Sequence, residues 1–193
     1  MANIILMETE DDIELQRKAN IIVAMDDMNG IGLNNTIPWH CKEDMRYFAQ
    51  LTKGCGNYSN AIIMGRNTWE SLPKKPLPGR INIILSSKTS DDIDSAEKTE
   101  HIKWFNTVND IKSYCNNKDF KDIWIIGGAK IYELFINDSY VKELYVTRIS
   151  GDHKCDTFFP EIPETFNQKI LESHYPPHHG VNYLIYRAID YKS

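Results

Sequence analysis

Short apolar runs alternate with segments of helical periodicity along most of the chain. Runs rich in β-branched residues predict strands at residues 20–25, 61–64, 81–87, 101–105 and 122–128. Between and after these runs, apolar residues recur at three- and four-residue spacing, which predicts helices at 41–53, 67–72, 108–115 and 129–136. Nearly continuous apolar strands that alternate with helices are typical of a parallel sheet covered on both faces. The fold class is therefore α/β.

The last third of the chain has a different pattern. Strands are predicted at residues 142–149, 165–174 and 182–189, and a Pro/Gly-rich loop joins the last two. This indicates an antiparallel pair at one edge of a mostly parallel sheet, which would have about eight strands in total. We expect one α/β domain over residues 20–193, preceded by a charged N-terminal extension at residues 1–19.

Composition narrows the classes of protein. A net charge of −5 and a pI near 5.7 argue against a general nucleic-acid or membrane-surface role, because such proteins carry a basic patch. No apolar run approaches the roughly 18 residues of a membrane span, so we expect a cytoplasmic protein. The cysteines form no CxxC pair, and the adjacent histidines lie in a Pro/Gly-containing segment. We therefore expect reduced thiols and no metal site at Cys41, Cys55, Cys115, Cys155, His178 and His179.

An aspartate occurs on the apolar face of the first predicted helix. Cys41, Asp44, Phe48 and Leu51 share one stripe, and a carboxylate on such a stripe costs several kcal/mol unless it is satisfied. An Asp in the first turn of a helix often only caps or charges that turn, but the neighbouring Glu43 can fill this role. We therefore favour a functional carboxylate that accepts two parallel hydrogen bonds from an amidine-like group and has a pKa raised by burial.

Several strands end in residues suited to phosphate. The strand at 122–128 runs through Gly127 and Gly128 into a helix, which predicts either a phosphate cradle or simply a tight turn that needs glycine. It is neither a Walker loop nor the G-x-G-x-x-G of a Rossmann domain. Arg66 follows a second strand, and residues 86–88 (Ser-Ser-Lys) end a third. Because ligands bind beyond the carboxyl ends of parallel strands, these groups together favour a site for an extra phosphate, although each residue alone is more often a solvated strand end.

Six motifs in order resemble the dihydrofolate reductase family: "IGLNNTIPW", "IIMGRNTWESL", "PLPGRINIILSS", "IIGGAKIYELF", "LYVTRI" and "CDTFFPEI". The resemblance implies the single-domain fold of that family and NADPH-dependent reduction of 7,8-dihydrofolate to 5,6,7,8-tetrahydrofolate. Hydride would go to C6 of the pterin while N5 takes a proton, supplying one-carbon metabolism and thymidylate synthesis. It also implies antifolate inhibitors as ligands, no nucleic-acid or membrane partner, and a monomer unless the chain is fused to a thymidylate synthase.

The resemblance also assigns roles to residues. Asp44 would hold the pterin, Thr147 would hydrogen-bond to that carboxylate, Trp39 would order water nearby, and Arg80 would pair with the α-carboxylate of the substrate's glutamate. The remaining substrate-binding residues would be Ile22, Val23, Ala24, Met45, Phe48, Leu72, Leu77 and Ile126. The NADPH-binding residues would be Ala24, Ile31, Gly65, Arg66, Asn67, Thr68, Ser86, Ser87, Lys88, Gly127, Gly128, Ala129, Lys130 and Tyr132.

Two further features follow from the resemblance, and two alternatives remain. Residues 31–39 would form the loop that closes over the nicotinamide, and the Gly127–Gly128 peptide bond would be cis. One alternative is a pyrimidine reductase of riboflavin synthesis with the same fold, against which Trp39, Asp44 and Arg80 argue together. The other is a non-catalytic folate-binding or interaction domain, although no catalytic group is missing.

Overall fold

The computed structural model describes residues 17–55, 58–87, 94, 97, 99–174 and 180–189, without the side chains of 172–174. Two segments about which the sequence made predictions therefore lie outside the described residues: most of the N-terminal extension, and the loop with His178 and His179. Lys88 also lies outside them.

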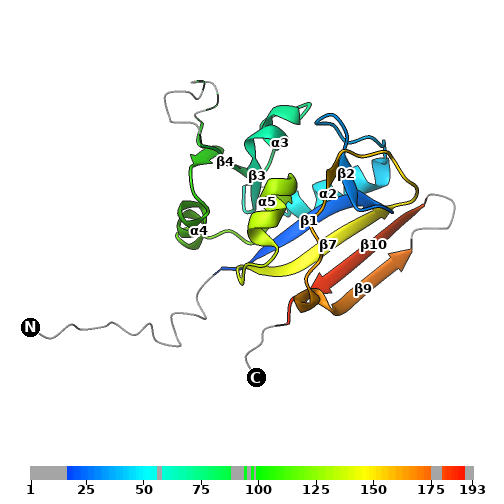
Figure 1. Cartoon of the computed structure of the whole chain (residues 1–193). Helices are drawn as coiled ribbons and strands as arrows, with labels where there is room; N and C mark the ends of the chain where they lie inside the picture. The colour runs from blue at the N-terminus through cyan, green and yellow to red at the C-terminus, as the bar shows by residue number, and fades with distance from the viewer. Residues whose placement is uncertain are drawn as a thin grey trace, which may run out of the picture.

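One eight-stranded sheet organises the molecule, in the order β5-β4-β3-β6-β1-β7-β10-β9 (Figure 1). β10 is antiparallel to its neighbours β7 and β9, and the other pairs are parallel, so the predicted mostly parallel sheet with an antiparallel edge is confirmed. Its strands are β1 (Ala19–Asp26), β3 (Ala61–Gly65), β4 (Ile81–Leu85), β5 (Ile102–Phe105), β6 (Ile123–Gly127), β7 (Val141–Ile149), β9 (Gln168–His174) and β10 (Val181–Arg187).

Helices cover both faces of this sheet. They are α2 (Lys42–Lys53), α3 (Arg66–Ser71), α4 (Val108–Asn116) and α5 (Ala129–Phe135). Alternate residues of β1 separate the two apolar cores: Ile21 and Val23 pack with residues of α4 and α5, whereas Ile22 packs with residues of α2 and α3. This alternation is the period of two that a strand imposes on its side chains.

Three short elements were not predicted. β2 (Gly30–Gly32) pairs with β8 (Thr157–Phe158) in a separate two-stranded sheet, and a 3₁₀ turn spans Glu164–Phe166. This turn occupies the start of the predicted strand 165–174, so β9 begins only at Gln168. Runs of two or three residues carry no readable periodicity, which is why the sequence did not reveal them.

The parallel strands place their carboxyl ends along one edge. There β3 ends at Gly65 and continues directly into α3, and β6 ends at Gly127 just before α5. The loop after β1 leads through β2 to α2, so three connections lie at this edge, where open α/β sheets bind ligands. None of the helices in the described part of the chain has the length and apolar character needed to cross a membrane.

Candidate functional site

Asp44 lies in the first turn of α2 and is half-buried. The helix is capped by Cys41, whose sulfur accepts the Asp44 N–H at 3.4 Å, and Glu43 adds the expected negative charge to the first turn. Burial raises the pKa of the Asp44 carboxyl, and a hydrogen bond with the buried Thr147 side chain of β7 only partly opposes this rise. The structure thus brings together Asp44 and Thr147, as the sequence reading expected, in an environment that favours proton uptake.

A cluster of apolar residues includes residues of α2, of α3 and of the segment after α3. Phe48 and Leu51 of α2 are only partly buried, and Leu72, Leu77 and Ile126 join them around one cluster with Ile22, Met64 and Trp69. Two of the residues expected to bind the substrate have other surroundings than the prediction implies. Val23 belongs to the core on the opposite face of the sheet, because neighbouring strand residues point to opposite sides. Met45 is 58% exposed and can contact a ligand only at the rim of this cluster.

Arg80 is the one strongly buried arginine among the described residues, with 4% of its surface exposed. Its guanidinium donates to the Thr52 hydroxyl and to the Pro78 carbonyl oxygen at 3.2 Å, and it lies 5.7 Å from the Phe48 ring centre. Within the described part of the chain no carboxylate pairs with it, and burial lowers its pKa. A buried cation without an anion is costly, so the site is suited to an anionic ligand group.

Trp39 lies where the loop 31–39 meets α2, and it packs with Tyr47 of α2 on a small cluster that includes Ile149 and Tyr183. Its indole N–H is buried and has no hydrogen-bond partner among the described residues. Its ring meets the His153 ring edge-on, with centres 5.1 Å apart. An unsatisfied buried N–H marks a place where a water or a ligand atom would be bound.

The glycines after β6 are tightly enclosed. The Gly127–Gly128 peptide bond is cis, as predicted, and Gly127 has a φ of 103°. A side chain on Gly127 would come within 2.9 Å of Tyr132, and one on Gly128 within 3.3 Å of the Thr68 hydroxyl. Only glycine therefore lets α3, α5 and the end of β6 approach this closely.

Arg66 opens α3 at the same edge. Its Nε pairs with Glu70 at 2.7 Å, while its Nη1 is buried with no partner among the described residues. Its guanidinium also lies 5.8 Å from the ring centre of Trp104. A guanidinium nitrogen left free in this way can bind an anionic oxygen.

The other expected cofactor residues are spread over different environments. Ser86 is buried and Ser87 exposed at the end of β4, Asn67 and Lys130 are exposed, and Ala24, Ile31, Gly65 and Ala129 are half-buried. Tyr132 is buried, and its hydroxyl donates to the Ile22 carbonyl oxygen at 2.9 Å, so its ring supports β1 from behind.

Two aspartates that the sequence did not predict as site residues contact the segment 30–39, which contains the predicted closing loop 31–39. Asp156 accepts the Asn34 N–H at 2.8 Å, and its own N–H donates to the Gly32 carbonyl oxygen at 3.0 Å. Hydrogen bonds from the Asn34 N–H and from the Thr157 hydroxyl lower the pKa of Asp156, with the Asn34 N–H as the main cause. Asp26 accepts the Gly30 N–H at 2.7 Å. Asp26 ends the first predicted strand and Asp156 lies in the motif "CDTFFPEI", but nothing in the local pattern indicates that either carboxylate contacts this loop.

One family model and several known proteins match most of this chain. The family model described as dihydrofolate reductase matches residues 18–191. A putative dihydrofolate reductase of Caenorhabditis elegans is 38% identical over 162 residues, which cover 80% of this chain and 83% of that protein. The dihydrofolate reductase of Drosophila melanogaster is 35% identical and covers 81% of this chain and 87% of its own length. A bifunctional dihydrofolate reductase-thymidylate synthase of Daucus carota is 32% identical, and the match covers 79% of this chain but 30% of that protein.

Proposed function

The chain belongs to the dihydrofolate reductase family, whose members reduce dihydrofolate, and we propose that it uses NADPH as hydride donor and forms 5,6,7,8-tetrahydrofolate. The observation that carries the substrate assignment is the line of groups along α2. Asp44, Phe48 and Thr52 are spaced four residues apart on one face, and Arg80 sits over Phe48 and donates to Thr52. The carboxylate and the guanidinium are thus separated by two helical turns, about 12 Å along the axis.

A folate matches this line in length and chemistry. Its pterin carries an amidine-like edge that can donate two parallel hydrogen bonds to Asp44, its aminobenzoyl ring fits beside Phe48, and its glutamate offers an α-carboxylate to Arg80. A ribosylated pyrimidine lacks the distal carboxylate and would leave Arg80 buried and unpaired. This argues against a pyrimidine reductase of riboflavin synthesis.

The residues at the carboxyl edge also fit NADPH. The Gly127–Gly128 turn leads directly into the start of α5, where backbone N–H groups suit a pyrophosphate, and the Nη1 of Arg66, which has no partner among the described residues, suits a 2′-phosphate. When bound there, NADPH supplies the hydride that C6 of the pterin receives. The adjacent Ser86 and Ser87 hydroxyls are further candidate contacts, while Lys88 stays a prediction from the sequence alone.

The protein's own part in the reaction is alignment and proton supply. Asp44 orients the pterin, and the negative charge of its carboxylate favours the protonated state of the ligand edge that it holds. Thr147 fixes the carboxylate, and Trp39 offers its buried N–H to an ordered water beside N5. Closure of the loop 31–39 would exclude bulk water, and the contacts of Asp156 favour that arrangement.

The test of the proposed function is the decrease in NADPH absorbance on addition of dihydrofolate. Turnover that requires both compounds supports the reductase. Binding of dihydrofolate without NADPH oxidation would instead indicate a folate-binding domain, and oxidation only with a ribosylated pyrimidine would indicate the other reductase.

The cofactor preference can be tested at Arg66. A 2′-phosphate accepts several charge-assisted hydrogen bonds of roughly 1.5–3 kcal/mol each before screening, so we expect NADPH to be favoured over NADH by about two to three orders of magnitude. Arg66→Ala should raise the Michaelis constant for NADPH about tenfold or more and leave that for NADH nearly unchanged. Steady-state kinetics with both cofactors measures this. Because the site is partly exposed, the preference should also decrease in 1 M salt.

Glu70→Gln is the matched control, because it keeps Arg66 and an acceptor for its Nε but removes the ion pair. It should retain the preference for NADPH. If Arg66→Ala weakened both cofactors equally, the phosphate site would have to lie elsewhere.

The remaining assignments are also proposals. We place the reductase domain at residues 20–193, with residues 1–19 as an extension, and assign the chain to the cytosol. We further propose that it is monomeric unless it is joined to a thymidylate synthase, an arrangement that the Daucus carota relative carries in its name.

A further inference from the structure

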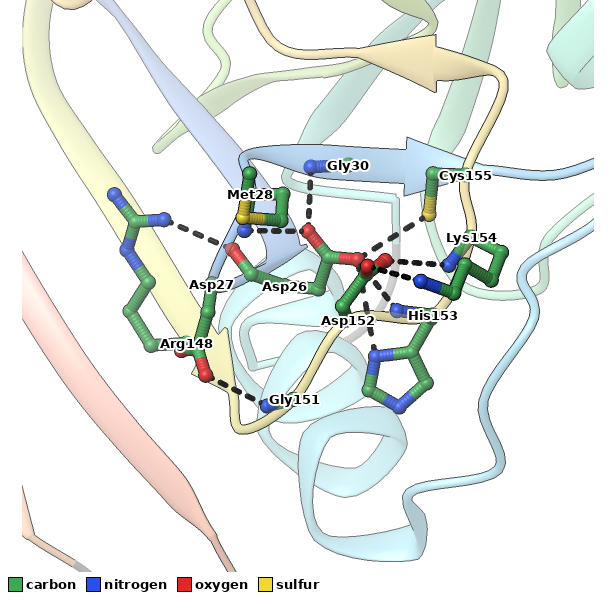
Figure 2. A network of polar contacts seen from close by, with 10 residues as sticks. All are labelled: Asp26, Asp27, Met28, Gly30, Arg148, Gly151, Asp152, His153, Lys154 and Cys155. Atoms are coloured by element: carbon green, nitrogen blue, oxygen red, sulfur yellow. Dashed lines mark hydrogen bonds and ion pairs between the residues drawn. The ribbon is translucent and has the colours of Figure 1, made fainter.

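A buried carboxylate, Asp26, lies outside the proposed folate site and contacts the segment that begins at Gly30. Asp26 ends β1 with none of its surface exposed, and it accepts backbone N–H groups from Met28 at 2.9 Å, Gly30 at 2.7 Å and His153 at 3.0 Å (Figure 2). The Cys155 thiol lies 3.6 Å from it. Burial alone would raise the pKa of Asp26, but these donors outweigh it, and the pKa lies below its ordinary value. The Asp26 carboxyl is therefore ionised at neutral pH.

The His153 ring lies between this charge and the proposed site. Its Nδ1 is 3.8 Å from an Asp26 oxygen and is buried without a hydrogen-bond partner among the described residues. The ring meets Trp39 edge-on, with the two planes at 70°. His153 thus joins the end of β1 to the indole of Trp39, whose buried N–H has no partner among the described residues.

Asp26 is the charged side chain that faces the ring of His153. Asp152 and Lys154 flank it on the same segment, but they pair with each other at 2.6 Å and are both exposed. From β1 the facing group is Asp26, and from the loop before α2 it is the uncharged Trp39. The segment that carries His153 is held by Asp26 through the backbone N–H of His153, while the ring keeps its contact with the indole.

We propose that His153 is a positioning residue for the reaction: Asp26 fixes its backbone through the His153 N–H, and the imidazole fixes the indole of Trp39. The proposal rests on the role given to Trp39 above. Van der Waals contact with a ring held from two sides restricts the indole to one orientation, so its N–H can bind the same water in every cycle. Because displacement of a reacting group by about 1 Å can cost about 100-fold in rate, a looser indole should affect kcat more than KM.

The first test compares His153→Ala with His153→Phe. The alanine variant removes the ring and should lower kcat about tenfold while both KM values stay within about twofold, and the phenylalanine variant restores the ring and should recover most of kcat. Circular dichroism and the melting temperature verify the fold, which a partly exposed side chain at this position should not disturb. Equal losses in both variants, or an unchanged kcat in His153→Ala, would overturn the proposal.

The second test needs neither substrate nor cofactor. The emission of Trp39 is obtained by subtracting the Trp39→Phe spectrum, and its anisotropy reports how freely the indole moves. His153→Ala should lower this anisotropy, because the indole loses the ring that it packs against edge-on, and His153→Phe should restore the wild-type value. An unchanged anisotropy in His153→Ala, or a loss of equal size in His153→Phe, would refute the contact.

Two histidines serve as controls. His40 is next to Trp39 in sequence but exposed, and His101 stacks on Tyr58 at a distance from the site. His40→Gln and His101→Phe should both keep the anisotropy and kcat. Failure of the proposed function is distinguishable, because a protein without reductase activity would still lose Trp39 anisotropy in His153→Ala if His153 holds Trp39.

Discussion

Asp44→Asn should fold, bind NADPH normally and lose about 100-fold or more of its turnover at pH 7. The amide can accept only one of the two hydrogen bonds that the pterin edge donates, and it carries no charge to favour protonation. Activity should recover partly in acid, where the substrate arrives already protonated. The measurement is the pH profile of kcat with dihydrofolate, and near-normal turnover at pH 7 would remove Asp44 from the reaction.

The same variant has a second readout that separates chemistry from folding. Burial raises the pKa of Asp44 above its unfolded value, so the native state binds a proton more readily than the unfolded state. Stability therefore falls as pH rises from the unfolded pKa through the folded one, and it stays lower at neutral pH. Asp44→Asn removes this loss, and the empty protein should melt at a higher temperature than the wild type at pH 7. A lower melting temperature would mean that the carboxylate serves the fold.

Arg80→Leu should weaken dihydrofolate and glutamate-bearing antifolates by about 2–5 kcal/mol, which is about 30-fold or more in Kd. The guanidinium is 4% exposed and lacks a carboxylate among the described residues, so a ligand carboxylate would be its ion-pair partner in a poorly hydrated site. Antifolates without a glutamate should bind with nearly unchanged Kd. Fluorescence titration with one inhibitor of each type gives the comparison.

Lys74→Leu is the matched control for this prediction, because Lys74 lies in the same segment but is exposed. An exposed cation at the rim contributes little, so both inhibitor types should keep their Kd within a few-fold. If Arg80→Leu weakened both inhibitor types equally, Arg80 would act by supporting Thr52 and Phe48 and not by binding the glutamate.

The sequence by itself determined the repeating units of this fold. The α/β class, the eight-stranded sheet and its antiparallel edge follow from local periodicity, which is a property of neighbouring residues and survives without tertiary information. Asp44 was identifiable for the same reason, because a carboxylate on an apolar stripe is a local conflict that needs an explanation. The need of Arg80 for an anionic partner could not be inferred in this way, because only the tertiary structure shows that no carboxylate of the described chain reaches it.

What only the tertiary structure decided are contacts between distant segments. Periodicity states that Ile22 and Val23 face opposite sides of β1, but not which side borders the site, and the sequence reading placed both in one wall. The link from Asp26 to His153 spans 127 residues, and the pairing of β2 with β8 also joins distant parts of the chain. Such contacts join segments that are far apart in the sequence, and they depend on how the strands are arranged in the sheet. No local pattern of side chains predicts them, so they could be identified only from the tertiary structure.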